Sequence, residues 1–166
     1  MEDEIAFDGT ANTNLDNTRR LGATLETGYA TERLSLSAGY SYTRAEFTDG
    51  PNNGNTIPLV PEHSGTAEAE YRIPAGVSIA GDMVARGDFY KSGDEANEQD
   101  RAPGRIELGS RVSWEPEFVE GLRLHAAGKN LLDTRNPTFV SADLGIGEGW
   151  YPTPGRRFEI GARFRR

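Results

Sequence analysis

The two histidines are the residues of this sequence best suited to bind a metal, but their positions do not favour that role. His63 and His125 are the only histidines, and there is no cysteine. They fall in different segments, and neither has a second ligand four residues away, the spacing that pairs two ligands on a helix. We therefore expect structural roles or exposure on a polar surface, with no metal site and no cofactor.

Acidic side chains offer a second kind of chemistry. Glu68 and Glu70 lie two residues apart, as do Arg105 and Glu107. Two carboxylates can act as acid and nucleophile in glycoside hydrolysis. In a strand, however, residues two apart share a face, where they form cross-strand charge pairs. No serine stands in a nucleophile-elbow context. We favour charge pairing and predict no enzyme.

Polar aromatic and cationic residues lie in, or directly beside, the long connections between the segments that we expect to form strands. Aromatic and arginine side chains dominate binding hot spots, and pockets for large ligands combine apolar walls with a few polar groups. We therefore predict ligand contact for Tyr90, Lys91, Arg101, Trp150 and Tyr151. The alternative is that these side chains pack within loops or lie at a membrane interface.

The composition favours strands and turns. The 166 residues include 20 glycines and 9 prolines, and the formal net charge is -8. This acidity argues against a nucleic-acid partner, because phosphate binding needs a basic surface. No run reaches the roughly 18 apolar residues of a membrane-spanning helix. We expect a single all-β unit over residues 1–166.

Alternation of apolar and polar residues predicts the strands. Between residues 34 and 43, Leu34, Leu36, Ala38 and Tyr40 alternate with small polar residues, and a period of two indicates a strand. Seven long stretches show this pattern, together with a short stub at 3–8. They are 18–30, 34–47, 62–72, 77–90, 105–114, 122–131 and 155–165. Most have about the ten residues that a tilted transmembrane strand needs.

The connections alternate in length. Short ones at 31–33, 73–76 and 115–121 take turns with long ones at 48–61, 91–104 and 132–154. Short turns at one end and long loops at the other are the plan of an outer-membrane β-barrel. We therefore predict an antiparallel up-and-down transmembrane β-barrel segment of about seven or eight strands.

The two faces of these strands differ in what can cover them. The polar face mixes charged residues, serine and glycine, and must meet water. The apolar face carries most of the aromatic residues, which we expect near strand ends at the membrane interfaces: Tyr29, Tyr40, Tyr42, Tyr71, Phe89, Trp114, Phe158 and Phe164. Lipid covers that face in a transmembrane barrel. The alternative is a small soluble or membrane all-β ligand-binding barrel or sandwich, which in its soluble form buries the same face internally.

Two C-terminal motifs carry a family resemblance. The stretch "AGKNLLDTRNPTF" at 127–139, followed by "GWYPTPGRRFEIGARF" at 149–164, resembles the end of TonB-dependent outer-membrane receptors. In that family an N-L-x-D motif follows the penultimate strand and P-x-P-G-R-x-F opens the last one. The stretches "YSYTRAEFTDG" and "IPLVPEHSG" also resemble the family.

The resemblance implies a role in energised import at the outer membrane of a Gram-negative bacterium. Such receptors take up a scarce ligand, such as a ferric siderophore or cobalamin, and contact TonB through an N-terminal plug. We expect this chain to be the C-terminal portion of the barrel, without plug or TonB box and not transport-competent by itself. We further expect it to contact outer-membrane lipid.

The last strand has a further expected role. An alternating C-terminal strand ending in Phe is, by the same resemblance, the signal for the barrel assembly machinery. Here it comprises Phe158, Ile160 and Phe164. A partial barrel leaves two open edges, which lipid does not tolerate. The chain either closes by pairing the stub at 3–8 with 155–165 or pairs with other chains.

Overall fold

Seven strands form one antiparallel sheet. The structure, a computed structural model, describes residues 5–7, 12–14, 17–142 and 147–165. Within this part the sheet has the order β11-β8-β7-β6-β5-β4-β3. Its strands are β3 (Thr18–Ala30), β4 (Leu34–Phe47), β5 (His63–Ile73), β6 (Val77–Arg86), β7 (Arg105–Trp114), β8 (Leu122–Lys129) and β11 (Arg157–Phe164).

The register places most of the large apolar residues of these strands on one face; Phe47 at the end of β4 and Val84 of β6 lie on the other face. Leu25 lies opposite Tyr40, Tyr40 opposite Gly65, Gly65 opposite Ala85, and Ala85 opposite Ile106. Directly opposite residues of an antiparallel pair point to the same side, so the alternation within each strand becomes a continuous apolar face. The predicted all-β antiparallel wall is confirmed.

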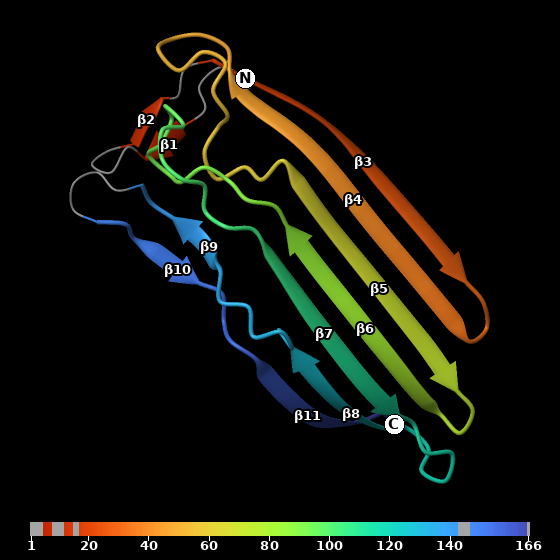
Figure 1. Cartoon of the computed structure of the whole chain (residues 1–166). Helices are drawn as coiled ribbons and strands as arrows, with labels where there is room; N and C mark the ends of the chain where they lie inside the picture. Colours follow the sequence, from red (N-terminus) through yellow and green to blue (C-terminus); the bar gives the residue numbers. More distant parts are fainter. Residues whose placement is uncertain (1–4, 8–11, 15–16, 143–146, 166) are drawn as a thin grey trace.

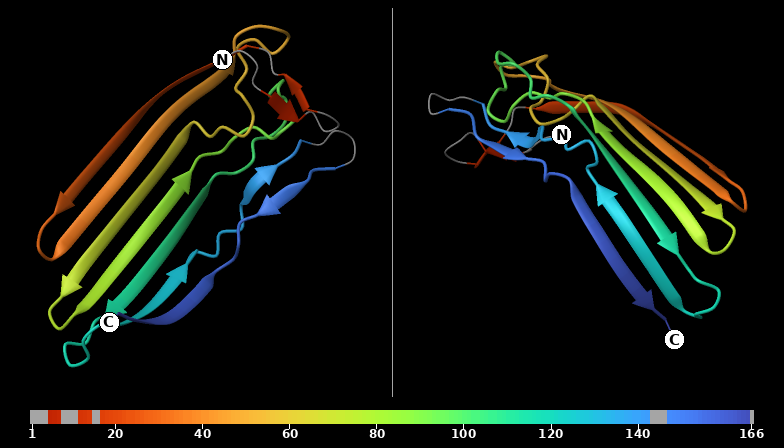
Figure 2. Two further views of the ribbon diagram at one scale, coloured as in Figure 1. Left: turned by 180° about the vertical axis from the view of Figure 1, so that it is seen from behind. Right: turned by 60° about the horizontal axis from the view of Figure 1, so that its bottom comes forward.

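This apolar face is exposed. Ile160 is 87% exposed, Phe158 74% and Leu25 68%. Figures 1 and 2 show the sheet as a single layer, and no second layer formed by the described residues is stacked on it. A soluble sandwich would bury these side chains, so the structure does not support that alternative. An apolar face of this size requires an apolar environment.

The two ends of the sheet differ. Short turns join the strands at one end, and the long connections lie at the other (Figure 1). Two small hairpins also lie at the long-loop end: β1 (Ile5–Phe7) pairs with β2 (Asn12–Asn14), and β9 (Pro137–Val140) pairs with β10 (Trp150–Pro152). The long connection predicted over 132–154 contains the second hairpin, which the sequence analysis did not predict.

The buried apolar clusters lie at the long-loop end of the wall and include the last residues of β4. Ala45 and Phe47 pack with Ile57 of the first long loop, and Val60 packs against them. Phe89, Ala102 and Val140 form a second cluster.

The position of Phe89 corrects the sequence analysis, which placed it on the apolar face within a strand over 77–90. β6 ends at Arg86, and the Gly87 N–H then donates to the carbonyl oxygen of His63. Phe89 instead forms a bridge with Ala102, which turns its side chain into a loop cluster.

The stub does not close the sheet. Ile5–Phe7 pairs with Asn12–Asn14, so the proposed pairing of 3–8 with 155–165 is wrong for the residues that the structure describes. β3 and β11 are the two borders of the sheet, each with one neighbour. No helix in the described ranges is long and apolar enough to cross a membrane.

Candidate functional site

The long connections form one structure, which we call the cap: residues 48–61, 87–104 and 130–156, as far as they are described. The Leu59 N–H donates to the carbonyl oxygen of Tyr90 at 2.8 Å. Asn97 accepts from the Thr56 N–H at 2.7 Å and donates back to the Thr56 carbonyl at 2.9 Å. These bonds fix the loops against one another, so residues from separate loops can contribute to one surface.

Tyr90 and Arg101 form a cation–π pair in this cap. The Arg101 guanidinium lies 4.5 Å from the centroid of the Tyr90 ring, and its Nη1 is 3.5 Å from Asp88 Oδ2. A hydrogen bond to the Tyr90 hydroxyl raises the pKa of Arg101, and the nearby Asp88 charge adds to the rise. The side chain is 36% exposed, so a positioned, permanent cation faces solvent.

Lys91 forms an ion pair within the cap. Its ammonium group pairs with Glu148, and its side chain is only 10% exposed. This pair ties the second long loop to the segment that leads into β10. Of the two cations predicted to contact ligand, both have an acidic partner within the cap, but Lys91 is 10% exposed and Arg101 is 36% exposed.

Trp150 and Tyr151 open β10 and are 58% and 68% exposed. The Tyr151 ring lies 5.8 Å from the ring of Phe139 on β9. The hairpin therefore presents broad aromatic surface at the long-loop end. No contact joins these two residues directly to Tyr90 or Arg101, so the structure brings them to one end of the molecule without assembling a single pocket.

Charge pairing marks the polar face of the wall. Arg105 Nε lies 2.9 Å from Glu107 Oε1, and an Arg111 nitrogen lies 3.9 Å from Glu70 Oε2. This agrees with the expected charge pairing of these groups. Glu68 departs from this expectation, because it lies directly opposite another acidic residue, Asp82, on the same face.

The histidines lie on opposite faces. His63 Nδ1 is 2.7 Å from the Tyr40 hydroxyl on the apolar face, whereas His125 Nε2 is 3.4 Å from Glu159 Oε1 on the polar face. No group of three or more metal-ligating side chains occurs among the residues described.

The N-L-x-D motif of the family resemblance forms a junction between the end of β8 and the start of β11. Asn130 is 4% exposed, and its side-chain amide donates to the carbonyl oxygens of Thr134 at 2.8 Å and Pro154 at 2.9 Å. Its Oδ1 accepts from the Thr134 N–H at 2.9 Å. Its φ of 49° turns the chain and ends β8 at Lys129, two residues earlier than predicted.

Asp133 completes this junction. Its Oδ1 accepts from the Arg156 backbone N–H at 3.0 Å, just before β11 begins. That hydrogen bond, and a second one from the Arg135 side chain, lower the pKa of the Asp133 carboxyl. Asn130 and Asp133 together hold the start of the last strand against the end of β8.

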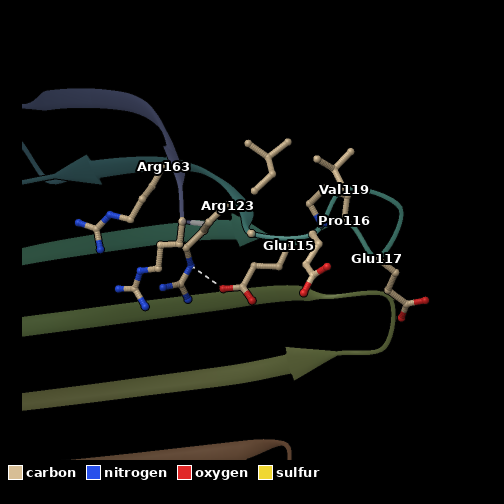
Figure 3. A pocket seen from close by; sticks show the side chains of 10 residues that line it. Glu115, Pro116, Glu117, Val119, Arg123 and Arg163 are labelled. Atoms are coloured by element: carbon tan, nitrogen blue, oxygen red, sulfur yellow. Dashed lines mark ion pairs between the residues drawn. The ribbon is translucent and has the colours of Figure 1, made fainter.

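A hollow of about 480 Å³ lies at the short-turn end (Figure 3). Arg123 Nε lies 2.9 Å from Glu115 Oε1 there, and Arg163 projects from β11 beside them.

The three residues predicted to form an assembly signal, Phe158, Ile160 and Phe164, are all exposed on the apolar face of β11.

Comparison with known proteins agrees with this architecture. The sequence model of the family described as "TonB dependent receptor-like, beta-barrel" matches residues 1–131. Among solved structures, the chain is similar to the siderophore receptor PiuA from Acinetobacter baumannii, with 21% identity and a TM-score of 0.79 over 98% of this chain and 24% of that one.

Two further structures are similar. The ferric yersiniabactin uptake receptor FyuA from Yersinia pestis has 22% identity and a TM-score of 0.80 over 93% of this chain and 24% of that one. The ferric citrate transporter FecA has 24% identity and a TM-score of 0.71 over 93% and 25%. The chain thus spans about a quarter of each. A comparison with curated proteins found no match.

Proposed function

Because this chain belongs to the TonB-dependent receptor-like β-barrel family, we propose that it forms the C-terminal portion of the barrel of a receptor that takes up a scarce ligand across the outer membrane. The proposed ligand class is a metal–siderophore complex or cobalamin. We propose that residues 1–166 form one unit of barrel wall, which needs the rest of a receptor for transport.

One observation carries this proposal: a single-layer sheet with an exposed apolar face on one side and charged residues on the other. An apolar outer face in lipid and a polar face towards a wet interior are the physical requirements of a membrane barrel. The family to which the chain belongs occupies the outer membrane of Gram-negative bacteria, which supplies that lipid. Family and structural neighbours are receptors and transporters, which supports import over catalysis.

The ligand surface in this proposal is the cap. Arg101 offers a cation held over the Tyr90 ring, and Trp150 and Tyr151 offer exposed aromatic area. A bulky chelate with charged edges and apolar arms fits such a mixture. The proposed partners are TonB, through a segment outside these residues, and the barrel assembly machinery, through Phe158, Ile160 and Phe164.

Uptake in cells tests the proposal. Cells that lack the gene are grown under iron limitation, each culture with one ferric siderophore, and under cobalamin limitation. Loss of growth on one of these ligands, restored by the gene, is the expected result. Unchanged growth on every ligand would contradict the proposed uptake role.

Binding of the identified ligand then tests the cap. Trp150→Ala is expected to weaken binding to whole cells about tenfold, the loss of a typical hot-spot residue. Trp114→Phe is the matched control, because Trp114 lies at the short-turn end of β7, opposite Val77. Equal affinity of both variants would remove the hairpin from the ligand surface.

A further inference from the structure

The first long loop contains the only asparagine of the chain that is followed by glycine. The pair is Asn53–Gly54, within the stretch "PNNGN". The side-chain amide of an asparagine is open to attack by the main-chain nitrogen of the next residue. Glycine permits this attack most readily, because it has no side chain and adopts many backbone conformations. The sequence therefore makes Asn53 the amide of this chain that is most susceptible to spontaneous deamidation.

The surroundings of this pair leave room for the reaction. Asn53 is exposed. Gly54 has a φ of 90°, and no heavy atom beyond its chain neighbours lies within 4 Å of the place where a side chain would begin. Asn97 of the second long loop is different, because its side-chain amide is bonded to the backbone of Thr56 at 2.7 and 2.9 Å. A bonded amide is not free to turn towards the nitrogen that follows it, whereas the space beside Gly54 is open.

One hydrogen bond restrains the reaction. The Gly54 N–H donates to the carbonyl oxygen of Phe47 at 2.9 Å, and the Phe47 N–H donates to the carbonyl oxygen of Asn55 at 3.0 Å. These two bonds fasten the loop to the end of β4, where Phe47 is 1% exposed. A main-chain nitrogen that keeps its proton in such a bond cannot act as the nucleophile. The bond must therefore open before Gly54 can react.

We propose that Asn53 is a site of spontaneous deamidation whose rate is set by local opening of the cap at Gly54. When the bond to Phe47 opens, the Gly54 nitrogen gives its proton to water and forms a bond with Cγ of Asn53. The Cγ–Nδ2 bond breaks, and ammonia leaves with a proton taken from water. A second water then adds to either carbonyl of the cyclic imide, and the product is aspartate or isoaspartate.

The reaction changes the loop in one direction only, because the ammonia is lost. Both products carry a new negative charge in the loop that already holds Asp49, and isoaspartate also adds one carbon to the main chain. The added carbon shifts Gly54 relative to Phe47, so the original hydrogen bond is not restored. The fraction of modified Asn53 therefore records how often this part of the cap has opened.

Peptide mass spectrometry tests the site. Outer membranes from cells that produce the receptor are incubated at neutral pH and then digested with trypsin, which releases residues 45–72 as one peptide. The same peptide, incubated after its release, is the unfolded reference. Conversion of Asn53 is expected to be slower in the folded receptor by about tenfold or more, because the reaction waits for local opening. In the free peptide, Asn52 and Asn55 should convert much more slowly than Asn53, because a residue with a side chain follows each.

A variant that loosens the first long loop tests the restraint. Asn97→Gly removes the side chain that bonds Thr56 and suits the positive φ of 57° at this position. In the folded receptor it is expected to raise the conversion rate of Asn53 about fivefold. Thr138→Val is the matched control, because it removes a hydrogen bond to the carbonyl oxygen of Tyr151 in the other hairpin. It should leave the rate unchanged.

Several outcomes would overturn the proposal. Equal conversion of Asn53 in the folded receptor and in the free peptide would show that the bond to Phe47 gives no restraint. Conversion of Asn53 no faster than that of Asn52 in the free peptide would remove it as the preferred site. An equal rise in Asn97→Gly and Thr138→Val, or no conversion in either folded variant, would exclude control by local opening at Gly54. The measurement involves no transported ligand, so its outcome is independent of the growth experiment.

Discussion

On the apolar face of the wall, large apolar side chains are exposed, whereas some of those at the long-loop end are buried. Ile160 on β11 is 87% exposed, while Phe47, where β4 meets the first long loop, is 1% exposed. The wall is held by inter-strand backbone hydrogen bonds and has its apolar face free for lipid. The cap, together with the last residues of β4, buries two small clusters. The two regions therefore suit different environments: the apolar face of the wall suits lipid, and the buried clusters at the long-loop end suit water.

The largest effect is expected from the buried residue at the border between β4 and the cap. Phe47→Ala removes the largest fully buried side chain, which typically costs about 3–5 kcal/mol of stability. Because the cluster belongs to the first long loop, limited proteolysis should cut within 48–61 while the wall still migrates as a folded, heat-modifiable band. Phe118→Ala, at a side chain 80% exposed, should leave cleavage unchanged. Loss of the folded band in Phe47→Ala would show that wall and cap do not unfold separately.

A charge on the apolar face of the wall is expected to have the next largest effect. Leu25→Arg, near the middle of β3, should cost about 2–4 kcal/mol in urea unfolding from phospholipid vesicles, because an arginine there enters hydrocarbon. Thr24→Arg, one residue away, points to the polar face beside Ser41 and should cost far less. Equal costs would contradict the assignment of the two faces.

A third experiment distinguishes a role of the last strand in assembly from a role of its aromatic residue in membrane anchoring. Phe164 and Tyr29 are exposed aromatics, 60% and 59%, at the short-turn ends of the two border strands. If Phe164 belongs to the assembly signal, Phe164→Ala should lower the folded outer-membrane yield several-fold, and Tyr29→Ala should lower it less. A loss of only 1–2 kcal/mol is enough to change abundance by that amount. Equal, heat-modifiable yields of Phe164→Ala and parent would defeat the assembly role.

The smallest effect concerns pH at the junction of wall and cap. The lowered pKa of Asp133 means that its charged form is favoured by folding. Its contribution to stability is therefore present above the ordinary carboxyl pKa of about 3.9 and is lost as pH falls through the lower folded value. Asp133→Asn should unfold more easily than the parent at pH 6, and the difference should shrink below about pH 4. A difference independent of pH would assign the effect to the hydrogen bonds alone.

The wall could be predicted from sequence because its rule is local. Alternation over most of β3 and β4 predicted the bounds of both strands without error, although Ala45 and Phe47 at the end of β4 lie on the polar face. The cap could not, because its contacts are non-local. Phe89 follows the same alternation, but the chain leaves the sheet at Gly87 and carries it into a loop cluster. The left-handed conformation of Asn130 shortens β8, and nothing in the apolar pattern signals it.

The candidate site was predictable only by residue type. Arginine and aromatic residues in long loops suggested ligand contact, yet the sequence did not reveal that Lys91 is paired with Glu148. Likewise, the acidic pair of Glu68 and Asp82 depends on a register that becomes visible only once the strands are paired. The sequence shows which side chains are charged or aromatic, whereas the fold determines which charges are paired.

The two borders of the sheet have unequal heights. β3 extends over 13 residues and β11 over 8, while a tilted strand needs about 9–11 to cross a bilayer. β3 is therefore longer than a bilayer crossing requires, and β11 is shorter. Next to the start of β11, the chain is held against the end of β8 by Asn130 and Asp133. A barrel completed from these two borders would therefore have an apolar belt that is taller along β3 than along β11.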